Sequence, residues 1–254
     1  MNLIRCEFPS DCLHTYVHVT VLLPKRMKTP LDDPKPKDTY PVLYLLHGAM
    51  DYGDNWIYRT NLAELVDEKE IAVVLPSVGN SFYLDEPDGL QYFTFLTEEL
   101  PDYLGSILPL SRKREDTFLG GLSMGGYGSL HAALRRPERY GKVFSLSGAM
   151  DIRRSSCFVS QCGASLPGQL RDRNALPGGE YDLFALLEKT DPAVMPPVFL
   201  ACGNEDFFMW DNLVLAETME KHGMRVTFHA AAGDHSWAFW RTWLNCAFDF
   251  LVQI

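Results

Sequence analysis

The chain has 254 residues, of which 46% are hydrophobic, and a formal net charge of -10 at pH 7. This length suffices for one large domain with a substantial buried core. The acidic balance and the lack of a basic patch exclude a nucleic-acid backbone as the expected partner. No stretch approaches about 18 apolar residues, and residues 1–10 lack the apolar run of a signal peptide. We therefore expect a cytoplasmic protein with no membrane segment.

Hydrophobic patterns along the chain alternate between strand-like and helix-like segments. Residues 13–23 alternate well enough for an antiparallel strand, and residues 25–39, rich in Pro, Lys and Asp, predict a turn or hairpin tip. Near-continuous apolar runs, typical of strands buried on both faces of a parallel sheet, follow at 40–46, 71–75, 117–119, 143–146, 198–201 and 226–229. Helical patterns occupy residues 61–69, 91–108, 127–135, 211–222 and 236–252, and an adjustment of the second of these is expected at Pro101.

This alternation predicts an α/β fold, with a mostly parallel twisted sheet and helices on both faces, in a single domain over residues 1–254. In such sheets ligands bind at the carboxyl ends of the strands. The alternation stops at residues 151–190, where Arg, Ser, Gly and Pro are frequent. We interpret this stretch as a loop excursion within the domain that could cover the site as a lid.

A G-x-S-x-G motif stands at Gly121-Leu122-Ser123-Met124-Gly125. The two glycines lack a Cβ, which lets a strand and a helix meet closely around a serine in a strained conformation. An apolar strand is expected before the motif and a helix after it, as such a turn requires. We therefore predict that Ser123 is an exposed nucleophile; the alternative is a glycine-rich loop with an idle serine.

A serine hydroxyl near neutral pH needs a base to take its proton. Of the seven histidines we choose His235, because it follows the last predicted strand and precedes the last helix. Asp206 follows the preceding strand and is expected to orient the imidazole, in preference to its neighbour Glu205. Asp234 is expected to shape the turn instead. The chain order Ser123, Asp206, His235 is typical of serine hydrolases built on open α/β sheets.

The negative charge that develops on an attacked carbonyl oxygen requires backbone N–H donors. Met124, directly after the serine, is expected to give one. The loop His47-Gly48-Ala49 follows an early apolar strand, and Gly48 lets the backbone turn inward, so Ala49 is the expected second donor; a plain turn is the alternative. This chemistry needs no metal, and the sequence contains no recognisable metal-ligand cluster.

Four segments together resemble the esterase D-like branch of the α/β-hydrolases, and bacterial tributyrin esterases most of all. They are residues 43–48, 121–128, 202–207 and 233–237. The resemblance extends over almost the whole chain and implies the α/β-hydrolase fold. It also implies hydrolysis of short-chain acyl esters, such as acetyl or butyryl glycerides, acetylated sugars and small aryl esters, without a cofactor.

The same resemblance marks Ser123, Asp206 and His235 as a catalytic triad and the N–H groups of Ala49 and Met124 as the oxyanion hole. Related feruloyl esterases cleave hydroxycinnamoyl esters. Several members self-associate, so a homo-oligomer stays open for this chain. Residues 151–190 match no part of the family pattern, which leaves the choice of substrate undecided from the sequence.

Aromatic residues near the expected mouth of the site are candidates for substrate contacts: Trp56, Tyr83, Phe207 and Trp237. Core packing is the alternative for each of them. Aromatic walls suit a small acyl group and a phenolic group equally, so acetyl, butyryl and cinnamoyl substrates are not separated. Acyl transfer to an alcohol and a non-catalytic binding module on the same fold are further alternatives. S-formylglutathione hydrolysis is disfavoured, because Leu122 replaces the histidine usual in that motif.

The six cysteines are sparse and form no C-x-x-C pair. We expect them to be mostly reduced thiols. Cys157 and Cys162 share a polar stretch and could pair under oxidation.

Overall fold

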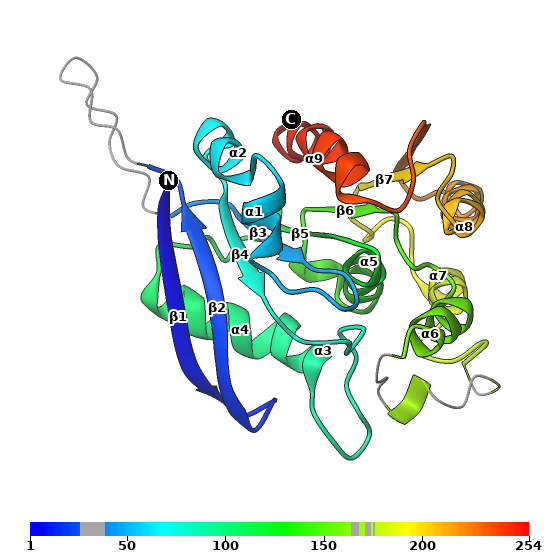
Figure 1. The fold of residues 1–254 in the computed structure, drawn as a ribbon, viewed down its shortest axis with the longest axis horizontal. Helices are drawn as coiled ribbons and strands as arrows, with labels where there is room; N and C mark the ends of the chain where they lie inside the picture. Colours follow the sequence, from blue (N-terminus) through cyan, green and yellow to red (C-terminus); the bar gives the residue numbers. More distant parts are fainter. Residues whose placement is uncertain (26–38, 164–167, 171–173, 175, 254) are drawn as a thin grey trace.

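The computed structural model describes residues 1–25, 39–163, 168–170, 174 and 176–253. These residues form an eight-stranded sheet in the order β1-β2-β4-β3-β5-β6-β7-β8, with helices on both of its faces (Figure 1). Most of the expected hairpin tip at residues 25–39 lies outside the described residues. None of the helices in the described ranges is both long and apolar enough to span a bilayer.

The sheet is antiparallel at one edge and parallel elsewhere. Strands β1 (Asn2–Ser10) and β2 (Thr15–Leu23) form an edge hairpin, and β2 pairs antiparallel with β4 (Ala72–Pro76). Every further pair is parallel: β4 pairs with β3 (Val42–Leu46), and β3 with β5 (Thr117–Leu122). The series continues from β5 through β6 (Lys142–Leu146) and β7 (Val198–Gly203) to β8 (Val226–Ala231) at the other edge. The inner strands carry apolar residues at consecutive positions because both faces of the sheet are covered. The predicted mostly parallel sheet is confirmed.

Two hydrophobic cores, one on each face, attach the helices to the sheet. The first core contains side chains from three helices: α1 (Asn55–Arg59), α2 (Leu62–Lys69) and α9 (Trp237–Val252). The second contains side chains from α3 (Tyr92–Thr94), α4 (Leu100–Ile107), α5 (Met124–Arg135), α6 (Ile152–Gln161), α7 (Leu183–Lys189) and α8 (Met209–Lys221). The sheet therefore lies between two layers of helices, as Figure 1 shows.

The helix expected over residues 91–108 is divided. Helix α3 runs through a π-helical turn (Phe95–Glu99) into α4. Pro101 lies in the first turn of α4, and it has no N–H to continue an α-helical ladder from the preceding turn. The missing N–H of Pro101 accounts for the change from α-helical to π-helical hydrogen bonding near this residue.

Residues 151–190 are not a loop throughout. They contain α6, α7 and a 3-10 turn (Gly168–Leu170). Helix α6 begins after Asp151, whose carboxylate accepts hydrogen bonds from the N–H groups of Arg153 and Arg154 at 2.9 and 3.1 Å. The cysteines of this region, Cys157 and Cys162, are both free, so they form no disulfide.

Candidate active site

Ser123 lies in a tight turn between β5 and α5. Its backbone has φ 53° and ψ -118°, a strained combination for a residue with a Cβ. A Cβ added at Gly121 would lie 2.7 Å from the backbone carbon of Gly125, and one at Gly125 would collide with the Leu46 carbonyl oxygen. Both glycines of the motif are therefore needed for the close approach of strand and helix.

Three side chains from three strand ends meet at this turn. Ser123 Oγ lies 3.1 Å from His235 Nε2, and His235 Nδ1 lies 2.9 Å from Asp206 Oδ2. The second carboxylate oxygen of Asp206 accepts a hydrogen bond from the Phe208 N–H at 2.8 Å. The residues predicted as nucleophile, base and orienting acid are thus brought together in hydrogen-bonding order.

The ionised state of Asp206 fixes the tautomer of the His235 imidazole. Burial alone would raise the pKa of this carboxyl, but the hydrogen bond and charge of His235 and the Phe208 N–H outweigh burial and hold the pKa below its usual value. The ionised carboxylate can only accept, so His235 carries its proton on Nδ1. Nε2 then presents a lone pair toward the Ser123 hydroxyl.

Aromatic rings surround this imidazole. The ring centroids of Phe207, Trp240 and Phe208 lie 4.4, 4.9 and 5.4 Å from that of His235. The side chain of His235 is 16% exposed. The ring is therefore held by packing as well as by its hydrogen bonds.

The loop after β3 runs directly beside Ser123. A Cβ on Gly48 would lie 2.6 Å from Leu122 Cδ1 and 3.4 Å from Ser123 Cβ. The preceding residue, His47, is buried, and its carbonyl oxygen accepts the Tyr83 hydroxyl at 3.0 Å. A larger residue at position 48 would therefore push the Leu122 side chain aside.

The His47 ring sets the orientation of the peptide between Gly48 and Ala49. Its Nδ1 lies 2.7 Å from the Gly48 carbonyl oxygen, and its Nε2 lies 3.1 Å from the Val78 nitrogen. A carbonyl can only accept and an N–H can only donate, so the ring is neutral with its proton on Nδ1. Burial lowers the pKa of His47 and favours this neutral form.

A trans peptide points its N–H away from its C=O. Because the His47 ring binds the Gly48 carbonyl, the Ala49 N–H of the same peptide points away from that ring. Among the described residues neither Ala49 N–H nor Met124 N–H donates to a protein acceptor, and both residues line the same cavity. Two backbone donors beside Ser123 are thus left for a ligand.

Ser123 and His235 line a cavity of about 620 Å³. Phe207 and Trp237, two of the aromatic residues predicted to contact substrate, also line it. Polar side chains enter from α1 and the loop before it, namely Asp51, Asn55 and Arg59. The cavity therefore combines an apolar lining with a polar portion.

Trp56 and Tyr83, the other two aromatic candidates, are buried and do not line this cavity. Trp56 donates to the Leu46 carbonyl oxygen at 3.3 Å, and its ring centroid lies 5.2 Å from that of Trp237. Tyr83 packs against Gly128, where a Cβ would lie 2.5 Å from the tyrosine ring. Both rings support residues of the site from behind.

Several cavity residues were missed from the sequence. Helix α6 contributes Ser155, Phe158 and Val159, and Phe82 and Arg59 come from other segments. The spacing of the α6 residues by three and four, after a capping aspartate, is a helical signal that could have identified them. Within the described residues, no group of three His, Cys, Asp or Glu side chains is arranged to hold a metal ion.

Comparisons with known proteins bear on the family and the fold of this chain. Residues 10–251 match the family model described as "Putative esterase". An acetyl esterase of Caldicellulosiruptor saccharolyticus is 30% identical over 276 aligned positions, which cover 100% of this chain and 99% of the relative.

Two solved structures from Staphylococcus aureus are similar over nearly their whole length. FphF, a fluorophosphonate-binding serine hydrolase, has a TM-score of 0.88 at 26% identity and covers 100% of this chain and 99% of its own. The S-formylglutathione hydrolase FrmB has a TM-score of 0.85 at 25% identity and covers 99% of each chain. The chain therefore has the α/β-hydrolase fold, belongs to the esterase family and is a carboxylic ester hydrolase.

Proposed function

We propose that this protein is a serine esterase that hydrolyses short-chain acyl esters through an acyl-enzyme on Ser123. The hydrogen-bonded series Ser123, His235 and Asp206 at the wall of a cavity large enough for a small ester is the main support. The acetyl esterase relative, aligned over the whole chain, supports the acyl class. Because the cavity must hold both the acyl and the alcohol part, a short acyl chain suits it best.

In the proposed reaction, Ser123 Oγ attacks the ester carbonyl while His235 Nε2 takes its proton. The tetrahedral intermediate collapses as the bond to the alcohol oxygen breaks, and His235 gives its proton to that oxygen. A water molecule, deprotonated by His235, then attacks the acyl-enzyme and releases the carboxylic acid. Ionised Asp206 stabilises the imidazolium that forms in both halves of the reaction.

The N–H groups of Ala49 and Met124 are the proposed donors to the oxyanion. Both are free of protein acceptors among the described residues, and Met124 stands at the N-terminus of α5, where the helix dipole also favours negative charge. His47 is the proposed support for the first donor, since its ring holds the Gly48 carbonyl on the opposite side of the same peptide.

Replacing His47 by phenylalanine should therefore lower kcat by about 10²-fold, with KM changed by less than about threefold. Phenylalanine keeps most of the ring volume but leaves the Gly48 carbonyl free to turn. The matched control is His131→Phe, since His131 is also buried and has its pKa lowered to about 4 by burial, but its Nε2 lies 3.0 Å from the Glu180 carbonyl oxygen instead of contacting the Gly48 peptide. A folded His47→Phe protein with wild-type kcat would contradict the proposed support.

The polar portion of the cavity suggests the kind of alcohol. Asp51, Asn55 and Arg59 offer hydrogen-bond partners that the hydroxyl groups of glycerol or a sugar can use. The aromatic lining also suits a phenolic acyl group, so a feruloyl ester is the second candidate.

A substrate series tests the proposal. We expect kcat/KM for p-nitrophenyl esters to be greatest at acetate or butyrate and at least about tenfold lower at octanoate. Tributyrin and methyl ferulate are measured beside them, and products are analysed with glycerol present to detect acyl transfer. A maximum at octanoate would refute the short-chain assignment, and a higher kcat/KM for methyl ferulate would identify a feruloyl esterase.

We also propose that residues 1–254 form one domain in which part of 151–190 covers the site. One continuous sheet and the family match over residues 10–251 support the first part. The three α6 side chains in the cavity lining support the second.

A further inference from the structure

Helix α6 forms one wall of the cavity that contains Ser123. Its residues Ser155, Phe158 and Val159 all line this cavity. In Figure 1, α6 and the polar contributor α1 lie on opposite sides of α5, the helix that follows the serine. The position of α6 therefore decides how much room the apolar part of the cavity offers.

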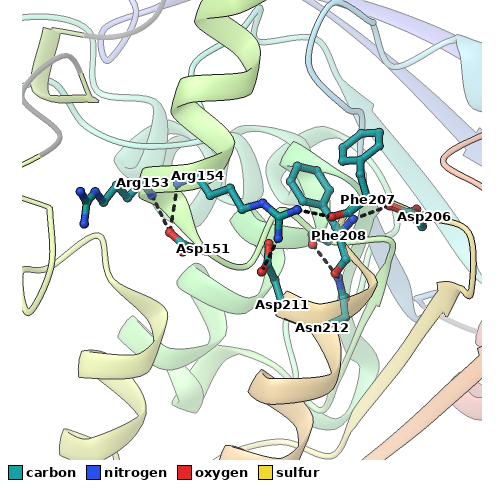
Figure 2. A network of polar contacts seen from close by, with 9 residues as sticks. Asp151, Arg153, Arg154, Asp206, Phe207, Phe208, Asp211 and Asn212 are labelled. Carbon is teal, nitrogen blue, oxygen red and sulfur yellow. Dashed lines mark hydrogen bonds and ion pairs between the residues drawn. The ribbon is translucent and has the colours of Figure 1, made fainter.

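A single guanidinium joins α6 to the segment after β7 (Figure 2). Arg154 Nη1 lies 2.9 Å from Asp211 Oδ1, and Nη2 donates to the Phe207 carbonyl oxygen at 2.8 Å. The side chain of Asp211, in the first turn of α8, is 8% exposed, and that of Arg154 is 49% exposed. The planar guanidinium holds two points of residues 207–211 at once, whereas a lysine ammonium lacks this fork geometry.

Phe207 extends this connection to the imidazole. Its ring centroid lies 4.7 Å from that of Phe158 on α6 and 4.4 Å from that of His235. Phe207 also follows directly on Asp206, which accepts the hydrogen bond from His235 Nδ1. A shift of Phe207 would therefore alter both the cavity wall and the surroundings of the imidazole.

We propose that Arg154 is a positioning residue that limits the size of the apolar group this esterase accepts. Bound to Asp211 and to the Phe207 carbonyl, it keeps α6 close to residues 207–211, so that Phe158 closes the apolar side of the cavity. It touches no reacting atom itself. The inference rests on the proposed function, because it concerns the substrate range of the site at Ser123.

The environment of Asp211 shows what Arg154 offsets. Burial raises the pKa of Asp211, and the charge and hydrogen bond of Arg154 oppose this rise. Asp211 Oδ2 has no hydrogen-bond partner within the described part of the chain. Removal of Arg154 alone would leave a buried carboxyl without its cation, whereas removal of both charges would not.

Three variants therefore test the proposal: Arg154→Met, Arg154→Lys and the double variant Arg154→Met/Asp211→Asn. The matched control is Arg153→Met, since Arg153 is the adjacent exposed arginine and its side chain points away from the Arg154 contacts in Figure 2. Values of kcat and KM are measured with p-nitrophenyl acetate, butyrate and hexanoate. If the single Arg154→Met variant does not fold, the kinetic values of the double variant and of Arg154→Lys still test the proposal.

We expect Arg154→Met and the double variant to raise the hexanoate-to-acetate ratio of kcat/KM at least about fivefold, and Arg154→Lys to raise it less. Arg153→Met should stay within about twofold of wild type. A loss of stability alone would not change this ratio. A wild-type ratio in the folded double variant would overturn the proposal.

Amide hydrogen exchange gives a second reading that needs no substrate. Exchange in α6 should be at least about tenfold faster in the double variant than in wild type, and unchanged in Arg153→Met. Wild-type exchange in the double variant would refute the attachment of α6 by Arg154. A wild-type protein without esterase activity would instead refute the proposed function, and the exchange result would still judge the attachment.

Discussion

Replacement of Ser123 by alanine is expected to lower kcat for p-nitrophenyl acetate by at least about 10⁴-fold. The variant keeps the fold, because alanine removes only the hydroxyl from a turn whose geometry is set by Gly121, Gly125 and the strand β5. No acyl-enzyme can form without this oxygen. Residual hydrolysis would come from water attack assisted by the two backbone donors.

The measurement combines steady-state rates with active-site labelling. A fluorophosphonate probe should modify wild-type protein once, at Ser123 by peptide mass spectrometry, and should leave the alanine variant unmodified. Ser106→Ala is the control, since Ser106 lies on α4 and is remote from the cavity lining. Wild-type turnover by the Ser123→Ala protein would exclude the mechanism, and absence of labelling in active wild type would exclude Ser123 as the nucleophile.

Asp206→Asn is expected to lower kcat by about 10³- to 10⁴-fold while the fold is retained. An asparagine amide can donate to His235 Nδ1, which selects the tautomer with its proton on Nε2. That nitrogen could then no longer accept the proton of Ser123. Glu205→Gln is the matched control, because the neighbouring Glu205 accepts from the Gly233 N–H at 2.6 Å and a glutamine oxygen can do the same.

The same variant has a stability signature. The pKa of Asp206 is lower in the folded protein than its usual value of about 3.9, so its contribution to stability is present above that pH and is lost as the pH falls through the folded pKa. Chemical denaturation of Asp206→Asn should therefore show a weaker pH dependence below about pH 4 than wild type. An equally steep dependence, together with unchanged kcat, would contradict both roles of the carboxylate.

The three residues of the proposed triad could be predicted because their positions follow from chain topology. Ser123 and Asp206 follow strands of consecutive apolar residues, and His235 follows the edge strand β8; the carboxyl ends of these parallel strands meet at one edge. The glycines of the motif add a local steric requirement that is visible in the sequence. The strand β1 was missed because it lies at the sheet edge, where exposed positions alternate with the buried Cys6, Phe8 and Ser10, a weak hydrophobic signal.

The cavity walls were less predictable, because the direction of a side chain depends on packing between distant segments. Trp56 and Tyr83 stand close in sequence to residues that line the cavity, yet both rings turn into the core. Phe158 belongs to a stretch rich in polar residues, and it reaches the cavity through the packing of α6, which contacts residues 207–211 and the core. Such contacts join residues more than fifty positions apart, as with Arg154 and Asp211 at a separation of 57, and leave no local pattern.

The aromatic rings packed around His235 restrict the order in which the alcohol leaves and water binds. Phe207, Phe208 and Trp240 pack around the imidazole, so in the proposed mechanism one nitrogen, Nε2, faces the reacting atoms in both halves of the reaction. The departing alcohol and the incoming water must therefore exchange a proton with this same nitrogen, one after the other. Water can enter only once the alcohol has left, and any second alcohol that reaches this place competes directly with water for the acyl group. Hydrolysis therefore occurs when water binds first beside Nε2, and acyl transfer occurs when a second alcohol binds there first.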